Sequence, residues 1–140
     1  MHKAKACIIK CIDFRFNKEI NAYLAENGYM GHSDIISIAG GSRDFIKPVH
    51  EDDGVYAWKQ LGLSIKLHEP DEILIIDHEE CGGYAQDGTI PVDMSSEDDK
   101  ACHEVFLNQL TEKILQKYPN KKVIPFFISK EGKVYAIELA

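Results

Sequence analysis

The chain has 140 residues, of which 44% are hydrophobic and 28% charged, a balance typical of one globular domain spanning residues 1–140. Its formal net charge of −7 argues against a nucleic-acid partner, because proteins that bind a phosphate backbone present a basic face. No apolar stretch approaches the length of a membrane span and no signal-peptide core can be recognised, so we expect a cytoplasmic protein without a membrane partner. In that compartment the four cysteines are expected to be ligands, reactive thiols or core side chains rather than disulfides.

Apolar β-branched segments alternate with amphipathic segments along the chain. The pattern predicts strands at residues 4–12, 34–39, 72–77, 122–129 and 133–139. Three helices are predicted between the first four strands. The first runs from Asn17 to Gly28, the second is capped by Asp52 or Asp53, and the third is opened by a Ser96–Asp99 capping box. The turn at residues 131–132 is too short for a crossover, so the last two strands are expected to be antiparallel. The predicted fold class is therefore α/β, with three α/β/α layers, a mostly parallel central sheet and a C-terminal antiparallel strand.

Two short clusters each follow a predicted strand: Cys-Ile-Asp-Phe-Arg at residues 11–15 and His-Glu-Glu-Cys-Gly-Gly at residues 78–83. In an open parallel sheet, ligands gather at the C-terminal ends of the strands, so we infer that Cys11 meets His78 and Cys81 there. Two thiolates and an imidazole suit zinc, and three protein ligands leave a vacant position for water. Zinc in such a site lowers the pKa of its water to about 7 and so provides a hydroxide nucleophile.

Asp13 and Arg15 follow Cys11 at alternate positions. If the first strand continues through them, Cys11, Asp13 and Arg15 lie on one face. An aspartate beside zinc can accept the proton of the hydroxide and orient it, or it can bind zinc as a fourth ligand in a closed state. A guanidinium holds a carboxylate with two hydrogen bonds and can prevent that closure. The alternative interpretation of Asp13 and Arg15 is an ordinary structural salt bridge.

Together, the two clusters resemble the signature of β-class carbonic anhydrases. Residues 38–41, Ile-Ala-Gly-Gly, are similar to the Asn-Ala-Gly-Gly turn of that family, whereas Asp77 stands where the family usually has a glycine. The resemblance implies zinc as cofactor, held by Cys11, His78 and Cys81, with Asp13 and Arg15 as the catalytic dyad. It implies reversible hydration of CO₂ to bicarbonate by a zinc-bound hydroxide. It also implies a homodimer or higher homo-oligomer, with residues 133–139, Phe14 and Phe16 as candidates for burial in the interface.

Other functions and residues remain open at this stage. The same motifs fit a zinc hydrolase of a CO₂-like substrate, either carbonyl sulfide or carbon disulfide, and a non-catalytic zinc or thiol regulatory module on the same fold. Cys7 and Cys102 are expected to pack in the core. Arg43 is expected to be structural. The histidines outside the clusters are expected to be solvated, although one of them could relay protons; they are His32, His50, His68 and His103.

Overall fold

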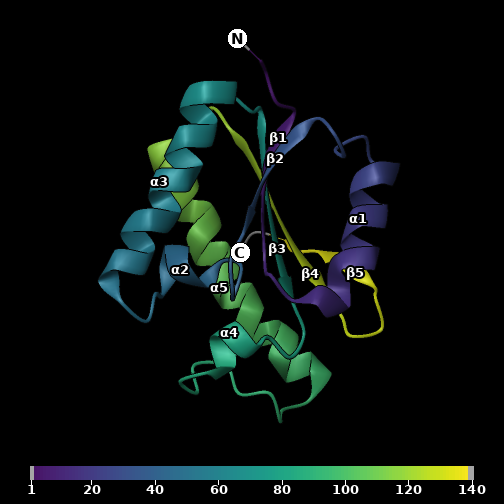
Figure 1. Cartoon of the computed structure of the whole chain (residues 1–140). Coiled ribbons are helices and arrows are strands. Elements are labelled where there is room, and N and C mark those ends of the chain that lie inside the picture. Colours follow the sequence, from purple (N-terminus) through teal and green to yellow (C-terminus); the bar gives the residue numbers. More distant parts are fainter. Residues whose placement is uncertain (1, 139–140) are drawn as a thin grey trace.

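The structure, a computed structural model, describes residues 2–138 (Figure 1). In chain order its elements are β1 (Ala6–Lys10), the 3₁₀ helix η1 (Phe14–Phe16), α1 (Asn17–Glu26), β2 (Ser33–Ser37), α2 (Arg43–Ile46), α3 (Glu51–His68), β3 (Glu72–His78), α4 (Gly82–Ala85), α5 (Ser96–Lys117), β4 (Lys122–Ile128) and β5 (Val134–Ala136). The strands form a five-stranded sheet in the order β2-β1-β3-β4-β5. All neighbouring strands are parallel except β4 and β5, which are antiparallel. The predicted fold class is therefore confirmed.

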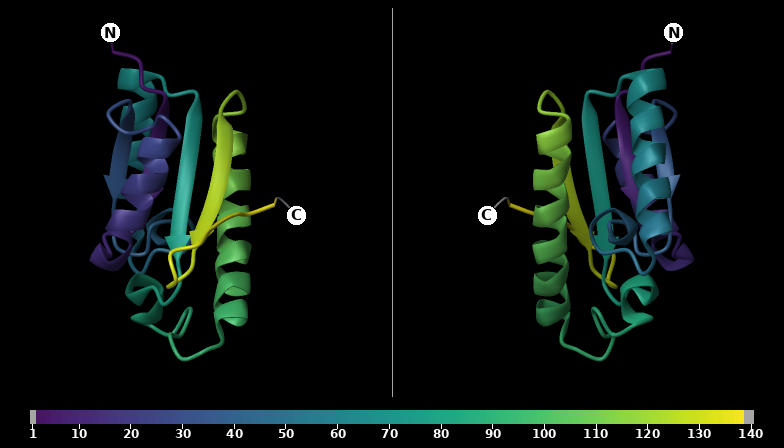
Figure 2. Two further views of the ribbon diagram at one scale, coloured as in Figure 1. Left: turned by 90° about the vertical axis from the view of Figure 1, so that its right-hand side faces the viewer. Right: turned by 90° about the vertical axis from the view of Figure 1, so that its left-hand side faces the viewer.

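Helices cover both faces of the sheet. α1 lies on one face, and α3 and α5 lie on the other, as the two side views show (Figure 2). Successive residues of β1 point to opposite faces: Cys7 and Ile9 join the core under α3 and α5, and Ala6 and Ile8 join the core under α1. Because both faces are buried, β1 and β3 consist of nearly continuous apolar side chains.

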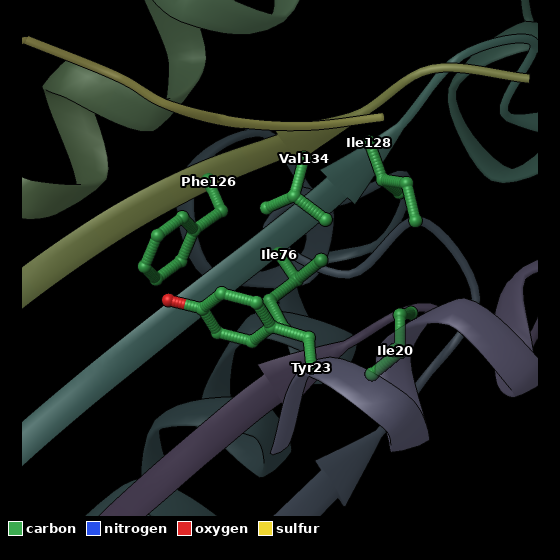
Figure 3. A pocket seen from close by; sticks show the side chains of 6 residues that line it. All are labelled: Ile20, Tyr23, Ile76, Phe126, Ile128 and Val134. Carbon is green, nitrogen blue, oxygen red and sulfur yellow. The ribbon is translucent and has the colours of Figure 1, made fainter. Parts of the chain in front are cut away.

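The helix α1 is anchored near the C-terminal ends of the central strands. Ile20 and Tyr23 pack against Ile76 of β3 and Phe126 of β4 around a small apolar cavity (Figure 3). This packing fixes the start of α1, and therefore η1 directly before it, beside the ends of β1 and β3. The turn that carries the first sequence cluster is thus attached to the core.

Several element boundaries differ from the predicted ones. α3 begins at Glu51, with His50 as the N-cap. α5 is capped by Ser95, whose Oγ accepts a hydrogen bond from the backbone N–H of Asp98 at 3.1 Å. The carboxylate of Asp99 cannot complete the predicted capping box, because it accepts a hydrogen bond from the backbone of Glu80. The last strand, β5, is shorter than the predicted strand at residues 133–139. The predicted end at residue 139 lies outside the described residues. None of the helices within residues 2–138 has the length and apolar character that a bilayer span requires.

Candidate metal centre

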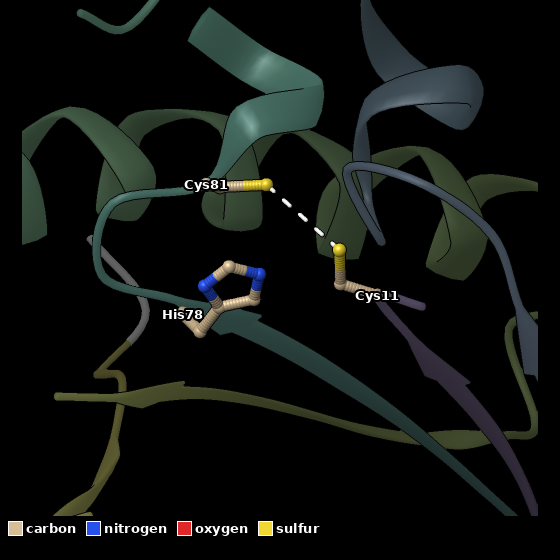
Figure 4. Close-up of side chains that lie close together, drawn as sticks. All are labelled: Cys11, His78 and Cys81. Carbon is tan, nitrogen blue, oxygen red and sulfur yellow. Dashed lines mark hydrogen bonds between the residues drawn. The ribbon is translucent and has the colours of Figure 1, made fainter. Parts of the chain in front are cut away.

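Cys11, His78 and Cys81 converge at the C-terminal ends of β1 and β3 (Figure 4). Cys11 directly follows β1, His78 is the last residue of β3, and Cys81 directly precedes α4. Because β1 and β3 are neighbouring parallel strands, their C-terminal ends meet, although the two cysteines are 70 positions apart. All three side chains are buried, and one potential ligand atom from each lies within 4.8 Å of the others. The fold thus brings together the three residues that the sequence predicts to meet.

The donor atoms of this cluster fit a zinc ion. Nδ1 of His78 lies 2.8 Å from the carbonyl oxygen of Glu79, and because a carbonyl only accepts, Nδ1 carries the proton. The lone pair then lies on Nε2, which is buried and has no hydrogen-bond partner in the described part of the chain. The Sγ atoms of Cys11 and Cys81 are 4.0 Å apart. Two sulfur ligands at tetrahedral positions around zinc are separated by about 3.8 Å, so little rearrangement is needed.

The two thiols lose their protons unequally when no cation is between them. The hydrogen bond between the two thiols lowers the pKa of Cys11, although burial opposes the shift. The same hydrogen bond raises the pKa of Cys81, and burial adds to the shift. The backbone N–H of Gly40 points at Sγ of Cys11 at 3.3 Å and favours the thiolate. A divalent cation at this position would stabilise both thiolates at once.

The loop before α2 lies against α4 at a very short distance. A Cβ added at Gly83 would lie only 2.6 Å from Cα of Gly40, so no larger residue fits at this position without a backbone shift. A Cβ added at Gly82 would meet nothing within 4 Å. The residue that approaches Gly83 so closely, Gly40, is the one whose N–H is directed at Cys11.

Asp13 and Arg15 lie beside the cluster, but a strand does not place them there. β1 ends at Lys10, so the alternation expected for Cys11, Asp13 and Arg15 does not occur. Instead, Asp13 is the N-cap of η1, and its Oδ1 accepts a hydrogen bond from the backbone N–H of Arg15 at 3.0 Å. Nε of Arg15 donates to both carboxylate oxygens of Asp13 at 3.1 Å, and Nη2 donates to Oδ2 at 2.7 Å. A tight turn therefore produces the predicted pairing.

The carboxylate of Asp13 is ionised and restrained next to the cluster. Hydrogen bonding to Arg15 holds the pKa of Asp13 below its ordinary value. Oδ2 of Asp13 lies 3.7 Å from Nε2 of His78, and Asp13 is not among the three residues whose ligand atoms lie within 4.8 Å of one another. Nη2 of Arg15 also donates to the carbonyl oxygen of Glu80 at 3.0 Å. The guanidinium thus connects Asp13 to the turn between His78 and Cys81.

A cavity of about 370 Å³ opens beside the cluster. It is lined by Cys11, Ile12, Asp13, Phe14, Arg15, Ala39, Gly82 and Gly83, so most of its lining is apolar side chain and backbone. Phe14 is 81% exposed. Phe16, by contrast, is buried within its own chain, where its ring stacks on that of His78 with the centroids 4.4 Å apart. The expectation that a partner subunit buries Phe16 is therefore wrong, because the core under α1 already does.

His103 is a residue whose position the sequence pattern does not predict. The sequence predicts a solvated side chain, but His103 is 0% exposed. Its Nδ1 lies 2.8 Å from Oδ2 of Asp77, and its Nε2 lies 3.3 Å from Oδ1 of Asp99. The spacing of Asp99 and His103 on α5 is a signal for this pair, since residues four apart are neighbours on a helix. The contact with Asp77 of β3 is visible only in the folded chain.

The remaining predicted residues have structural roles. Cys7 is fully buried in the core, and Cys102 is half-buried against Tyr84 and the cysteine cluster, as expected. Arg43 is buried and donates to the carbonyl oxygen of Gly83 at 2.9 Å and to the carboxylate of Asp87 at 2.6 Å. It therefore holds α4 against α2, in agreement with the structural interpretation.

Comparison with known proteins gives matches over almost the entire chain. A family model described as "Putative carbonic anhydrase" matches residues 1–138. An uncharacterized protein of Rickettsia conorii is 27% identical over 137 residues, which are 98% of this chain and 74% of the relative. A protein of Rickettsia bellii, also uncharacterized, is 25% identical over 137 residues, 98% of this chain and 84% of the relative.

Solved structures of β-carbonic anhydrases have the same fold. The β-carbonic anhydrase CafA of Aspergillus fumigatus superposes with a TM-score of 0.67 at 13% identity, over 99% of this chain and 77% of that one. Isoform I of Trichomonas vaginalis superposes with a TM-score of 0.57 at 21% identity, over 97% of this chain and 83% of that one. A tetrameric β-carbonic anhydrase of Sordaria macrospora gives a TM-score of 0.64 at 11% identity, over 98% and 82% of the two chains.

Proposed function

Because this chain belongs to the family described as "Putative carbonic anhydrase", we propose that it catalyses the reversible hydration of CO₂ to bicarbonate with zinc as cofactor. The observation that carries the proposal is the buried cluster of Cys11, His78 and Cys81 beside a carboxylate that Arg15 restrains. Cys11 and Cys81 would bind zinc as thiolates and balance its charge, and His78 would bind it through Nε2. Zinc, when bound, supplies a Lewis acid that makes hydroxide available near neutral pH.

The proposed role of Asp13 is to orient the attacking water. Its carboxylate is ionised and lies 3.7 Å from Nε2 of His78, so it is adjacent to the position where the three ligand atoms converge. A carboxylate there accepts a proton or a hydrogen bond from water and directs a lone pair towards the substrate carbon. Arg15 would hold Asp13 away from the metal ligands, so that water keeps access to the metal.

The proposed substrate site is the cavity next to the cluster. CO₂ is small and uncharged, and the apolar side chains of Ile12, Phe14 and Ala39 line this cavity.

The proposal extends to assembly, domain organisation and compartment. We expect a homodimer or a higher homo-oligomer, since Ile12 and Phe14 are 58% and 81% exposed beside the cavity and C₂ dimers are the commonest assemblies. Residues 1–140 are proposed to form one domain, because every described strand belongs to the same sheet. A cytoplasmic location is proposed because all four cysteines are free thiols.

A stopped-flow CO₂ hydration assay on protein of measured zinc content tests the proposal. We expect hydration that rises with pH through an ionisation near neutrality or somewhat above it. The same protein is then assayed with carbonyl sulfide and with carbon disulfide. Turnover of either one without CO₂ hydration would replace the proposal by the hydrolase alternative, and zinc-loaded protein inert towards all three would indicate a regulatory module.

A further inference from the structure

His103 lies outside the cluster of Cys11, His78 and Cys81, and it has no part in the proposed reaction. It belongs to α5, is fully buried, and packs against the rings of Tyr84 and Phe127, with centroids 5.0 and 5.3 Å away. Burial alone would lower the pKa of His103, but the carboxylates of Asp77 and Asp99 outweigh it and raise the pKa to about 9. At neutral pH a buried imidazolium therefore lies between two buried carboxylates.

The carboxylate of Asp77 connects His103 to the strand that carries His78 and to the loop that contacts Cys11. Asp77 directly precedes His78 on β3, and its Oδ2 lies 2.8 Å from Nδ1 of His103. The same carboxylate accepts hydrogen bonds from the backbone N–H and from Oγ of Ser42, at 3.2 and 2.8 Å. Ser42 follows the Gly40–Gly41 loop, in which the N–H of Gly40 is directed at Sγ of Cys11.

The carboxylate of Asp99 connects His103 to the turn before Cys81. Oδ2 of Asp99 accepts a hydrogen bond from the backbone N–H of Glu80 at 2.7 Å. Glu80 directly precedes Cys81 and has a φ of 56°, a left-handed conformation that is unfavourable for a residue with a side chain. Asp99 therefore stabilises a strained turn, and the position of Sγ of Cys81 depends on that turn.

Charge balance makes these contacts depend on His103. Asp77 and Asp99 are each about 2% exposed, so water cannot stabilise their negative charges. A buried carboxylate that loses its cationic partner is strongly unfavourable, and it then moves towards water. That movement would weaken its hydrogen bonds to Ser42 or to Glu80.

We propose that His103 is a positioning residue of the metal centre. It acts through the carboxylates of Asp77 and Asp99. These hold the segments of the three proposed ligands, Cys11, His78 and Cys81, at the spacing that zinc requires. The inference rests on the proposed function only in that it takes the cluster to bind zinc. It requires no contact between His103 and the metal or the substrate.

The test is the zinc affinity of His103→Gln, measured by competition with a chromophoric chelator on protein that circular dichroism shows to be folded. We expect zinc binding to weaken about 10–100-fold, the cost typical of losing a group that orients metal ligands. The Co²⁺-substituted variant should also show altered thiolate-to-cobalt absorption. His68→Gln is the matched control, because its Nδ1 lies 2.7 Å from Oδ2 of Asp34 in a similar pair distant from the cluster. It should bind zinc as the wild type does.

A second variant decides the outcome if His103→Gln does not fold. Asp99→Ala removes the acceptor of the Glu80 N–H and should weaken zinc binding in the same way, whereas Asp98→Ala, at an exposed site in the same turn, should not. Folded variants of His103 or Asp99 with wild-type zinc affinity and an unchanged cobalt spectrum would overturn the inference. A wild-type protein that binds no zinc would overturn the proposed function, and the inference with it.

Discussion

Arg15 donates hydrogen bonds to both carboxylate oxygens of Asp13, and its Nη2 also donates to the carbonyl oxygen of Glu80. One guanidinium thus joins the turn after β1 to the turn after β3. A planar guanidinium can make these contacts simultaneously, whereas the ammonium of lysine cannot reproduce the geometry. Oδ2 of Asp13 lies only 3.7 Å from Nε2 of His78. The proposed role of this guanidinium clamp is therefore to keep the carboxylate from binding the metal.

Arg15→Ala should keep its zinc and lose activity near neutral pH. Without the clamp, the carboxylate of Asp13 can move to the fourth position and exclude water, so we expect CO₂ hydration to fall roughly 100-fold. Activity should recover partly at alkaline pH, where hydroxide competes with the carboxylate, and Arg15→Lys should restore little. The measurement is a series of hydration rates against pH at known zinc content. Loss of zinc would show that Arg15 is a structural support, and unchanged rates would remove it from the mechanism.

Gly83→Ala should destabilise the protein, whereas Gly82→Ala should not. A Cβ at Gly83 would collide with the backbone of Gly40, and overpacking of this kind costs about 1–3 kcal/mol of unfolding free energy. A Cβ at Gly82 meets nothing within 4 Å, so its effect should stay within about 0.5 kcal/mol. Urea unfolding of both variants gives the comparison. Equal stabilities would mean that α4 and the loop before α2 do not approach each other as described.

The free energy of unfolding should depend on pH through His103. Its pKa is about 9 in the folded chain against an ordinary value of 6.5, so its stabilising contribution is complete below pH 6.5 and is lost as the pH rises through 9. The groups facing it are Asp77, Asp99 and Tyr84. The pKa of Tyr84 is raised by burial, and that of Asp99 is lowered because hydrogen bonds outweigh burial, so neither titrates in this window.

Urea unfolding of the metal-free wild type and His103→Gln, at pH 6 and above pH 9, measures this contribution as a difference. The stability gap between the two proteins should be largest at the lower pH and should shrink as the pH rises. A gap that does not change with pH would show that His103 is buried as a neutral imidazole.

The substitution Phe14→Glu should dissociate the oligomer that we expect for the wild type. Phe14 is 81% exposed beside the cavity, and a side chain of this kind at the centre of an interface contributes strongly to association. Light scattering at micromolar concentration should show a dimer or a larger assembly for the wild type and a monomer for Phe14→Glu. Tyr56→Glu, at an exposed position on α3, is the control and should remain assembled. A catalytically active wild-type monomer would contradict the proposed assembly.

Much of the fold follows from local sequence signals. The apolar runs that become β1 and β3 have no polar alternation, which is typical of strands buried on both faces, and the short turn at residues 131–132 allows only an antiparallel pair. The strand pattern also leads to the inference that Cys11 meets His78 and Cys81, since parallel strands end at the same edge of a sheet.

The features that the sequence pattern predicts incorrectly depend on contacts distant in the chain. The chain leaves β1 at Lys10 because Asp13 caps η1, and that turn replaces the expected alternation. His103 is buried because Asp77 lies opposite it on β3, across a sequence separation of 26 residues. Neither composition nor periodicity reports such a pairing, because a histidine on a helix has the same local signature whether solvent or a carboxylate faces it.

The most direct test of the central claim measures zinc content and CO₂ hydration together for the wild type, Cys81→Ser and Cys102→Ser. Cys81 is a proposed ligand, whereas Cys102 is half-buried outside the ligand set, so the pair is matched in chemistry. We predict about one zinc per chain and measurable hydration for the wild type and Cys102→Ser, and loss of most of the zinc and of the hydration for Cys81→Ser. Full zinc occupancy and unchanged hydration in Cys81→Ser would contradict the account, as would a zinc-loaded wild type without hydration at any pH from mildly acidic to alkaline.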